Sequence, residues 1–261
     1  MGLENEPTPV GRARGEGDPL GRPGRFASRA AYTVDVEVAL GWPVLRALSD
    51  AETVLDVGCG SQVWSWTRRL GPQRLRRSLG LDTFKSSFDP CPSGTRYGAY
   101  VQGDGAHLPF RDGSFDAVIA LDFIEHLPKD SGGRAVAEMK RVAQRTVVVM
   151  TPNGFVPQES AENPFQRHLS GWSLPELEAL GFKVFGIRGL RNLRGGFARP
   201  KIRPYPVGLG LSLLTAPLAR VRPTWAFQLV GVWRRVGTAE SERDRPPLAP
   251  EVPCVGETGS R

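Results

Sequence analysis

Residues 54–60, VLDVGCG, combine a short apolar run, a carboxylate and two glycines separated by one residue. Apolar residues bounded by glycines are typical of a buried parallel strand that ends in a tight turn. Because glycine lacks a Cβ atom, Gly58 and Gly60 allow backbone conformations closed to other residues and let a ligand approach the turn amides. The pattern fits any strand-to-helix unit that binds a nucleotide, and it also fits an ordinary tight turn.

Three later apolar runs end in a polar residue in the same way: LGLD at 79–82, YVQGD at 100–104 and FDAVIALD at 115–122. The carboxyl ends of parallel strands meet at one edge of a sheet, which is where open α/β sheets bind their ligands. Asp82 lies about 20 residues beyond the glycine turn, where an acid binds ribose hydroxyls in doubly wound folds. We therefore predict a doubly wound α/β fold with a ligand site at its carboxyl edge.

The periodicity of the rest of the chain predicts helices that alternate with strands. Helices are expected over 28–48, 64–70, 131–143 and 173–180, and further strands over 146–150, 182–187 and 225–233. Ser173 is expected to cap the last of these helices, which stops at Gly181.

Taken together, VLDVGCG, GLD and GDGAHLPFRDGSFDAVIALDFIEHLP resemble the class I S-adenosylmethionine-dependent methyltransferases, in particular the small-molecule branch that includes the quinone methyltransferases. The resemblance covers residues 53–182, and its most specific part is 103–128. It implies a Rossmann-like sheet of seven strands, mostly parallel with an antiparallel last strand, and helices on both faces. It also implies S-adenosyl-L-methionine as the cofactor.

The resemblance assigns the cofactor site residue by residue. It implies that Asp56 helps to place the cofactor and organise the turn, that Asp82 accepts both ribose hydroxyls, and that Asp104 contacts the adenine amino group. The implied cofactor-binding residues are Asp56, Gly58, Gly60, Asp82, Thr83, Asp104, Gly105, Ala106 and Leu121. The structural alternative is that the glycines only form a tight strand-to-helix connection and that the acids only cap neighbouring helices or loops.

The turn departs from the family pattern at one point. A further small residue and a glycine usually follow GCG, whereas Ser61, Gln62 and Val63 follow it here. Loss of that glycine would crowd the turn beneath the methionine portion of the cofactor. A protein that keeps the fold as a binding module without catalysis is therefore an alternative.

Histidines are the candidate catalytic residues. Methyl transfer from a sulfonium depends mainly on holding the nucleophile about 3 Å from the methyl group, and a histidine can remove a proton from a hydroxyl or an acidic carbon. His126 falls close to the methyl group by resemblance and is the candidate general base, with a histidine bonded to backbone as the alternative. His168, in NPFQRHLSGW, either contacts the substrate or seats its loop, and His107 is predicted to be structural.

The chain of 261 residues is long enough for one α/β domain with its embellishments. We predict a methyltransferase domain over 26–237 with a lid or insertion at 189–224, and disordered tails at 1–25 and 238–261, which are poor in large apolar residues. No secretory signal and no membrane-spanning run is indicated. The three cysteines are too far apart for a compact metal motif, so no metal is predicted and the cytoplasm is the expected location.

The formal net charge of +7 includes one basic cluster in residues 188–203, which contain no acid. Its members are Arg188, Arg191, Arg194, Arg199, Lys201 and Arg203. Such a patch attracts RNA, anionic lipid or a phosphorylated substrate, and a solvated loop is the alternative. The apolar run that follows, 207–221, would cover the active site as a lid or lie in a membrane interface beside the basic residues.

These observations predict a methyltransferase that acts on a small or amphiphilic acceptor, with oxygen favoured as the acceptor atom. An RNA substrate is disfavoured but stays open, because the chain has no NPPY-like tetrapeptide and no paired catalytic cysteines. A membrane-associated methyltransferase that contacts lipid through 188–221 also stays open. A nicotinamide dehydrogenase is disfavoured, since the third glycine of its turn is missing. The sequence indicates no oligomeric state.

Overall fold

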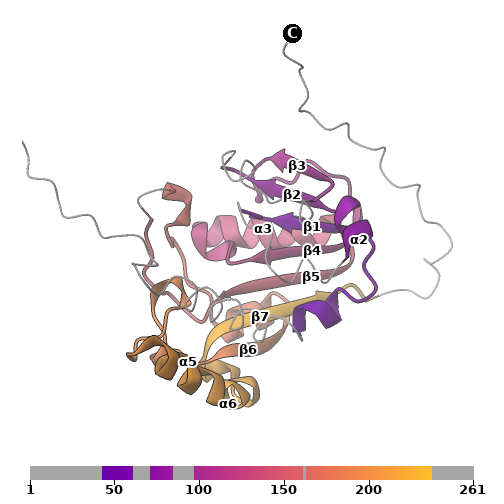
Figure 1. The fold of residues 1–261 in the computed structure, drawn as a ribbon. Coiled ribbons are helices and arrows are strands. Elements are labelled where there is room, and N and C mark those ends of the chain that lie inside the picture. Colours follow the sequence, from indigo (N-terminus) through magenta and orange to yellow (C-terminus); the bar gives the residue numbers. More distant parts are fainter. Residues whose placement is uncertain (1–42, 61–70, 85–96, 161–162, 237–261) are drawn as a thin grey trace, which may run out of the picture.

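The computed structural model describes residues 43–60, 71–84, 97–160 and 163–236 (Figure 1). Its seven strands form one sheet in the order β3-β2-β1-β4-β5-β7-β6. The strands are β1 (Val54–Val57), β2 (Leu79–Asp82), β3 (Ala99–Gln102), β4 (Phe115–Leu121), β5 (Ala143–Pro152), β6 (Lys183–Leu190) and β7 (Ala226–Arg234). β7 is antiparallel to both of its neighbours, and every other pair is parallel. The predicted fold class is confirmed.

The strand order reverses direction beside β1. The chain first adds β2 and β3 on one side of β1 and then crosses to β4 and β5 on the other side. In a doubly wound sheet, such a reversal leaves a crevice at the carboxyl ends of the two central strands. The turn after β1 and the segment after β4 therefore face the expected ligand site.

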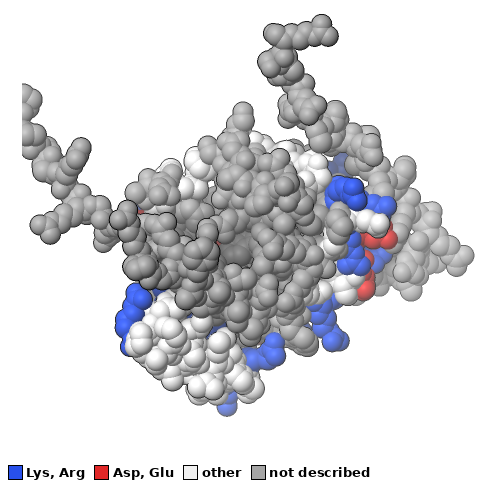
Figure 2. Space-filling view, in the orientation of Figure 1, with Lys and Arg blue, Asp and Glu red and all other residues white. Residues whose placement is uncertain are grey.

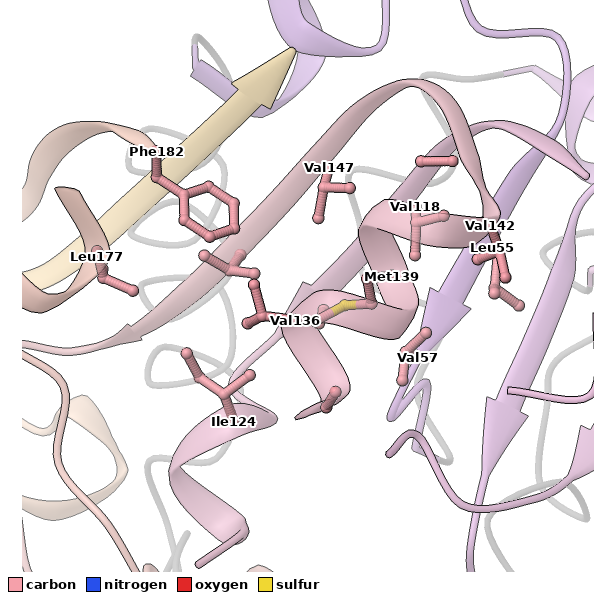
Figure 3. Close-up of a cluster of buried hydrophobic side chains, with 14 of the residues drawn as sticks. Leu55, Val57, Val118, Ile124, Val136, Met139, Val142, Val147, Leu177 and Phe182 are labelled. Carbon is pink, nitrogen blue, oxygen red and sulfur yellow. The ribbon is translucent and has the colours of Figure 1, made fainter. Parts of the chain in front are cut away.

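One face of the sheet is covered by α3 (Lys129–Val142), which matches the helix predicted over 131–143. Side chains alternate across a strand, so every second residue of β1, β4 and β5 faces this helix. The buried cluster between them includes Leu55, Val57, Val118, Val136, Met139, Val142 and Val147 (Figure 3). These apolar contacts hold the sheet and α3 together.

The opposite face carries a second buried cluster. Val44 and Leu48 pack there against Val54 and Ile119 on neighbouring strands. Residues 43–47 are helical, in agreement with the described part of the helix predicted over 28–48. The helix predicted over 64–70 lies outside the described residues, as do the predicted tails.

The other helices are short and lie at the ends of strands. They are α2 (Pro72–Arg76), α4 (Leu174–Ala179), α5 (Tyr205–Leu214) and α6 (Ala216–Val221), with 3-10 turns η3 (Ile124–His126), η4 (Pro164–Gln166), η5 (Arg191–Leu193), η6 (Gly196–Ala198) and η7 (Pro223–Trp225). At the start of α4, the Glu176 carboxylate accepts hydrogen bonds from the backbone N–H and the hydroxyl of Ser173. This is the helix start that the sequence predicts.

The segment between β6 and β7 holds α5 and α6, at the lower left of Figure 1. β6 runs in the same direction as β5, because each is antiparallel to β7. The segment therefore leaves and re-enters the sheet at its carboxyl edge, the edge at which the glycine turn lies. Among the described helices, none is long and apolar enough to cross a membrane.

Candidate functional site

The turn after β1 is fixed to the end of β2 by backbone hydrogen bonds. The N–H groups of Gly58 and Cys59 donate to the carbonyl of Leu81 at 2.7 and 3.1 Å, and the N–H of Gly60 donates to Asp82 Oδ2 at 2.9 Å. Gly58 and Gly60 have φ values of +74° and +59°. Both angles lie in the left-handed region that favours glycine, as the sequence predicts for a tight turn.

The glycines of the site face different surroundings. A Cβ atom on Gly58 would lie 2.4 Å from Phe123 Cδ2, and one on Gly105 would lie 2.5 Å from Phe123 Cζ. The Phe123 ring therefore occupies the space that both glycines leave, so these two glycines serve packing. A Cβ on Gly60 would meet no atom within 4 Å among the described residues. Gly60 is the glycine at which a ligand has room to approach.

Asp82 caps the glycine turn with both of its carboxylate oxygens. Oδ2 accepts from Gly60, and Oδ1 accepts from the N–H of Phe84 at 2.8 Å. A carboxylate oxygen has about two lone-pair sites, so each oxygen can accept one more hydrogen bond. The neighbouring Thr83 hydroxyl donates to the carbonyl of Gly103 at 3.0 Å and joins the ends of β2 and β3. The capping role and the predicted ribose role of Asp82 are therefore compatible.

Asp104 organises the loop after β3. Its Oδ1 accepts from the N–H of Ala106 at 2.9 Å, and its Oδ2 accepts from Nδ1 of His107 at 2.8 Å. Partial burial acts to raise the pKa of Asp104, but the hydrogen bonds from Ala106 and His107 outweigh it and hold the pKa below its usual value. The Asp104 side chain is still 55% exposed, so it remains accessible to a ligand.

Asp56 lies beneath the turn and not on its surface. The residue is 2% exposed, and its Oδ2 accepts a hydrogen bond from the Tyr97 hydroxyl at 2.6 Å. Burial raises the pKa of Asp56 to about 7, against the lowering effect of the Tyr97 hydrogen bond. Its contacts in the structure are those of a residue that supports the turn.

The raised pKa of Asp56 predicts a loss of stability with rising pH. The folded protein retains the proton to about pH 7, whereas the unfolded chain releases it near pH 4, so the free energy of unfolding falls between these values. We expect Asp56→Asn, which keeps an acceptor for Tyr97, to remove at least about 2 kcal/mol of this fall. Urea denaturation at pH 5 and pH 8 measures the change in the free energy of unfolding. Tyr97→Phe should make this free energy fall more steeply with pH. If the free energy of unfolding varies with pH in the same way in all three proteins, the raised pKa of Asp56 is refuted.

The end of β4 has a strained residue beside the site. Asp122 has a φ of +54°, and its Oδ1 accepts from the side-chain amide of the buried Gln228. Burial raises the pKa of Asp122 to about 6, while Arg188 acts in the opposite direction. Leu121, predicted to lie beside the sulfonium, is 2% exposed and packs in the core on the face away from α3. Strained backbone of this kind is common at functional sites.

A docked loop brings His168 to His126. The carbonyl of Glu125 in η3 accepts from the N–H groups of Leu169 and Ser170 at 2.8 and 3.0 Å. The indole N–H of Trp172 donates to the carbonyl of Ile124 at 3.2 Å. These bonds seat residues 168–172 on η3, and the rings of the two histidines lie 4.8 Å apart at 71°.

Both histidines are neutral near pH 7. Burial lowers the pKa of His126 to about 4 and also lowers the pKa of His168. His126 Nδ1 lies 3.1 Å from the carbonyl of Arg167, and His168 Nδ1 lies 2.6 Å from the carbonyl of Val156. A carbonyl only accepts, so Nδ1 carries the proton in both rings and Nε2 keeps its lone pair. The general-base role of His126 and the substrate contact of His168 stay predictions.

Sequence reasoning missed the buried acid Glu125 next to these histidines, and it noted the partly buried Asp122 only as the polar end of a strand. Glu125 is 1% exposed, and burial raises its pKa well above the usual value, with a further rise from the neighbouring Asp122. The signal was present in LDFIEH, where two acids three residues apart follow a buried strand and precede a histidine. Acids at a strand end with such neighbours are candidates for a functional site.

The basic cluster is smaller at the surface than the sequence predicts. Arg188 and Arg194 are 4% and 2% exposed, so they belong to the interior and not to a solvated patch. The guanidinium of Arg194 donates to the carbonyls of Arg188 and Ala198 at 2.9 and 2.7 Å. The Arg194 guanidinium thus supplies hydrogen-bond donors for carbonyls inside the loop. The exposed members are Arg191, Arg199, Lys201 and Arg203.

A family model described as "Methyltransferase domain" matches residues 55–150. These residues contain the glycine turn, Asp82, Asp104 and the segment after β4. Residues 55–150 are therefore similar to a methyltransferase domain. The match begins in β1 and ends in β5, so the domain model covers the first five strands of the sheet.

Solved structures with a similar fold include two methyltransferases. A SAM dependent methyltransferase from Archaeoglobus fulgidus is 18% identical, with 81% of this chain and 97% of that chain covered and a TM-score of 0.49. Magnesium protoporphyrin IX methyltransferase from Synechocystis PCC 6803, solved with bound SAM, is 16% identical, with 84% and 86% covered and a TM-score of 0.44.

Proposed function

We propose that the protein is an S-adenosylmethionine-dependent methyltransferase that acts on a small or amphiphilic acceptor, with oxygen as the favoured acceptor atom. The observation that carries the proposal is the arrangement at the carboxyl edge of the methyltransferase domain. There the glycine turn, Asp82 and Asp104 stand at the ends of three adjacent strands. The cytoplasm remains the location that we propose.

The residues at this edge fit the cofactor. Each Asp82 oxygen accepts one hydrogen bond from the described residues and has the capacity to accept one ribose hydroxyl, and the Asp104 side chain is 55% exposed for the adenine amino group. Among the described residues, none fills the space where a Cβ atom on Gly60 would lie. Each group already holds the local backbone in place, so the site is preorganised for binding.

When bound, S-adenosylmethionine supplies a methyl group on a sulfonium, which is displaced by an in-line nucleophile. The chain needs only to position that nucleophile and exclude water. His126 and His168 each keep a lone pair on Nε2, which suits them to accept a hydrogen bond from an acceptor hydroxyl. These lone pairs support a hydroxyl oxygen as the acceptor atom that we favour.

The proposal is tested on the full-length protein in two steps. Calorimetry with S-adenosylmethionine is expected to show one saturable site. The protein is then incubated with methyl-labelled cofactor and a metabolite and lipid extract, and the labelled product is identified by mass spectrometry. Label in a small or amphiphilic molecule supports the proposal. Binding without transfer would favour a binding module, and label in added RNA would favour an RNA methyltransferase.

An amphiphilic acceptor is favoured by an exposed apolar surface on α5, α6 and η7. This α5–α6 patch consists of Val207, Leu211, Leu214, Leu218, Val221 and Trp225, each between 38% and 78% exposed. The exposed basic residues nearest in sequence are Lys201, Arg203, Arg220 and Arg222. Figure 2 shows uncharged residues in white at the lower left with blue side chains around them. Residues 183–235 contain eleven Lys and Arg and no acid.

We propose that the α5–α6 patch binds an anionic membrane surface. Apolar side chains flanked by arginine or lysine are the composition of interfacial helices, in which leucine and tryptophan enter the headgroup region while the cations face anionic lipid. Such a surface has a use here, because the segment that carries the patch begins and ends at the carboxyl edge of the sheet, the edge at which the glycine turn lies. An amphiphilic acceptor could then pass from the lipid to the site.

Charged substitutions in the patch should abolish vesicle binding. We expect Leu214→Asp combined with Val221→Asp to reduce co-sedimentation with vesicles of 30% phosphatidylglycerol in phosphatidylcholine at least about 10-fold, since both side chains leave the apolar phase. Val236→Asp, at a 96% exposed site outside the patch, is the matched control. Equal binding of all three proteins, or salt-sensitive binding to RNA without vesicle binding, would contradict the membrane proposal.

A further inference from the structure

Glu125, His126 and His168 place three potential metal ligands together. One ligand atom from each residue lies within 4.8 Å of those from the other two. Glu125 and His126 are consecutive in η3, and His168 is brought to them by the loop that docks on the Glu125 carbonyl. The cluster is therefore assembled by tertiary contacts between two segments that are 42 residues apart in the chain.

The histidines have the hydrogen bonds that metal ligands require. In each ring, Nδ1–H donates to a backbone carbonyl, of Arg167 for His126 and of Val156 for His168. Such a bond fixes the orientation of the ring and leaves Nε2 unprotonated for coordination. The two ring centroids lie 4.8 Å apart, and each neutral imidazole offers one lone pair.

Glu125 supplies an independent sign that the cluster suits a cation. The residue is 1% exposed, and within the described ranges neither carboxylate oxygen has a partner at hydrogen-bond distance, although the Thr151 hydroxyl lies beside them. A buried carboxylate with so little compensation is costly, because burial removes its hydration. The neighbouring Asp122 is a second acid and accepts a hydrogen bond from Gln228.

We propose that Glu125, His126 and His168 bind a divalent transition-metal ion. Two imidazoles and one carboxylate form a known ligand set for zinc and for non-haem iron, with open positions for water or substrate. Bonds of about 2.1 Å would bring the donors to roughly 3–3.5 Å from one another, so the cluster closes by about 1 Å on binding. Imidazole ligands favour zinc, cobalt or iron over magnesium. The sequence predicts no metal site, because that expectation rested on cysteine spacing alone.

The test uses the full-length protein after removal of metal with a chelator. Co²⁺ is titrated and followed by its visible absorption and by calorimetry, and we expect one ion per chain. His168→Ala should lower the Co²⁺ affinity at least about 10-fold. Glu125→Gln should lower it similarly while keeping or raising the thermal stability of the metal-free protein, since it replaces a buried acid by a neutral side chain of similar size. His107→Ala, which changes the third histidine of the chain, is the matched control and should bind Co²⁺ like the wild type.

Two outcomes would overturn the metal site. One is the absence of saturable Co²⁺ binding by the wild-type protein, which would leave the paired histidines as a packing contact. The other is unchanged affinity in either His168→Ala or Glu125→Gln. Metal binding is measured without cofactor or acceptor, so a failed metal titration leaves the methyltransferase proposal standing. A failed cofactor titration likewise leaves the metal site standing.

Discussion

Replacement of Asp82 by alanine is expected to weaken S-adenosylmethionine binding about 100-fold or more. The carboxylate holds Gly60 and Phe84 through their backbone N–H groups, and these described bonds leave each oxygen the capacity to accept one more. Alanine removes two charge-assisted hydrogen bonds to the ribose, each worth about 1.5–3 kcal/mol, and also releases the glycine turn. About 100-fold corresponds to roughly 3 kcal/mol in affinity. Calorimetric titration of the purified variant measures the change.

A second acid that caps backbone gives the matched control. Asp116 accepts hydrogen bonds from the N–H groups of Glu52 and Thr53, both at 3.0 Å, at the opposite end of β1. Asp116→Ala therefore removes a similar cap without touching the carboxyl edge. It should lower stability and leave cofactor affinity within about 3-fold of the wild type. If Asp82→Ala also binds the cofactor like the wild type, the ribose assignment fails.

The strand ends could be predicted from sequence because their signal is local. LGLD at 79–82 coincides with β2, and FDAVIAL at 115–121 coincides with β4. A run of apolar residues that stops at a carboxylate needs no distant contact to be recognised. Parallel pairing then brings these ends to one edge, so the place of the candidate site followed from the same local signals.

The histidine cluster could not be predicted in the same way. His126 and His168 were singled out separately, but their contact depends on the docking of residues 168–172 onto η3. Those hydrogen bonds join backbone groups, and the identity of the side chains does not indicate where such bonds form. Glu125 was missed for a related reason, since an acid in a helix-start motif normally faces solvent.

Burial of basic residues also escaped prediction. Arg188 and Arg194 stand in a run of arginines without acids, which normally indicates a solvated surface. In the structure, the Arg194 guanidinium bonds to carbonyls of its own loop, so the partners are backbone groups and not acids. A prediction that considers only pairing between charged side chains therefore places these two arginines at the surface, which is wrong.

Replacement of Trp172 by alanine is expected to cost about 3–5 kcal/mol of unfolding free energy and to release the loop that bears His168. Trp172 is 3% exposed, its indole N–H donates to Ile124, and Lys129 Nζ lies 3.8 Å from the ring centroid. A Cβ on Gly132 would lie 2.6 Å from its ring, so α3 packs directly against it. Urea denaturation measures the loss of stability.

Release of the loop has its own readout, the amide hydrogen exchange of Leu169 and Ser170, whose N–H groups donate to Glu125. Both amides should exchange faster in Trp172→Ala than the loss of global stability requires, because the loop opens locally. Leu177→Ala, at a fully buried position in α4, is the control that destabilises the same core by about 2–5 kcal/mol, and its side chain has no hydrogen bond to η3 to lose. Equal acceleration in both variants would mean that Trp172 acts through global stability alone. Faster exchange only in Trp172→Ala would identify the indole as the residue that positions His168.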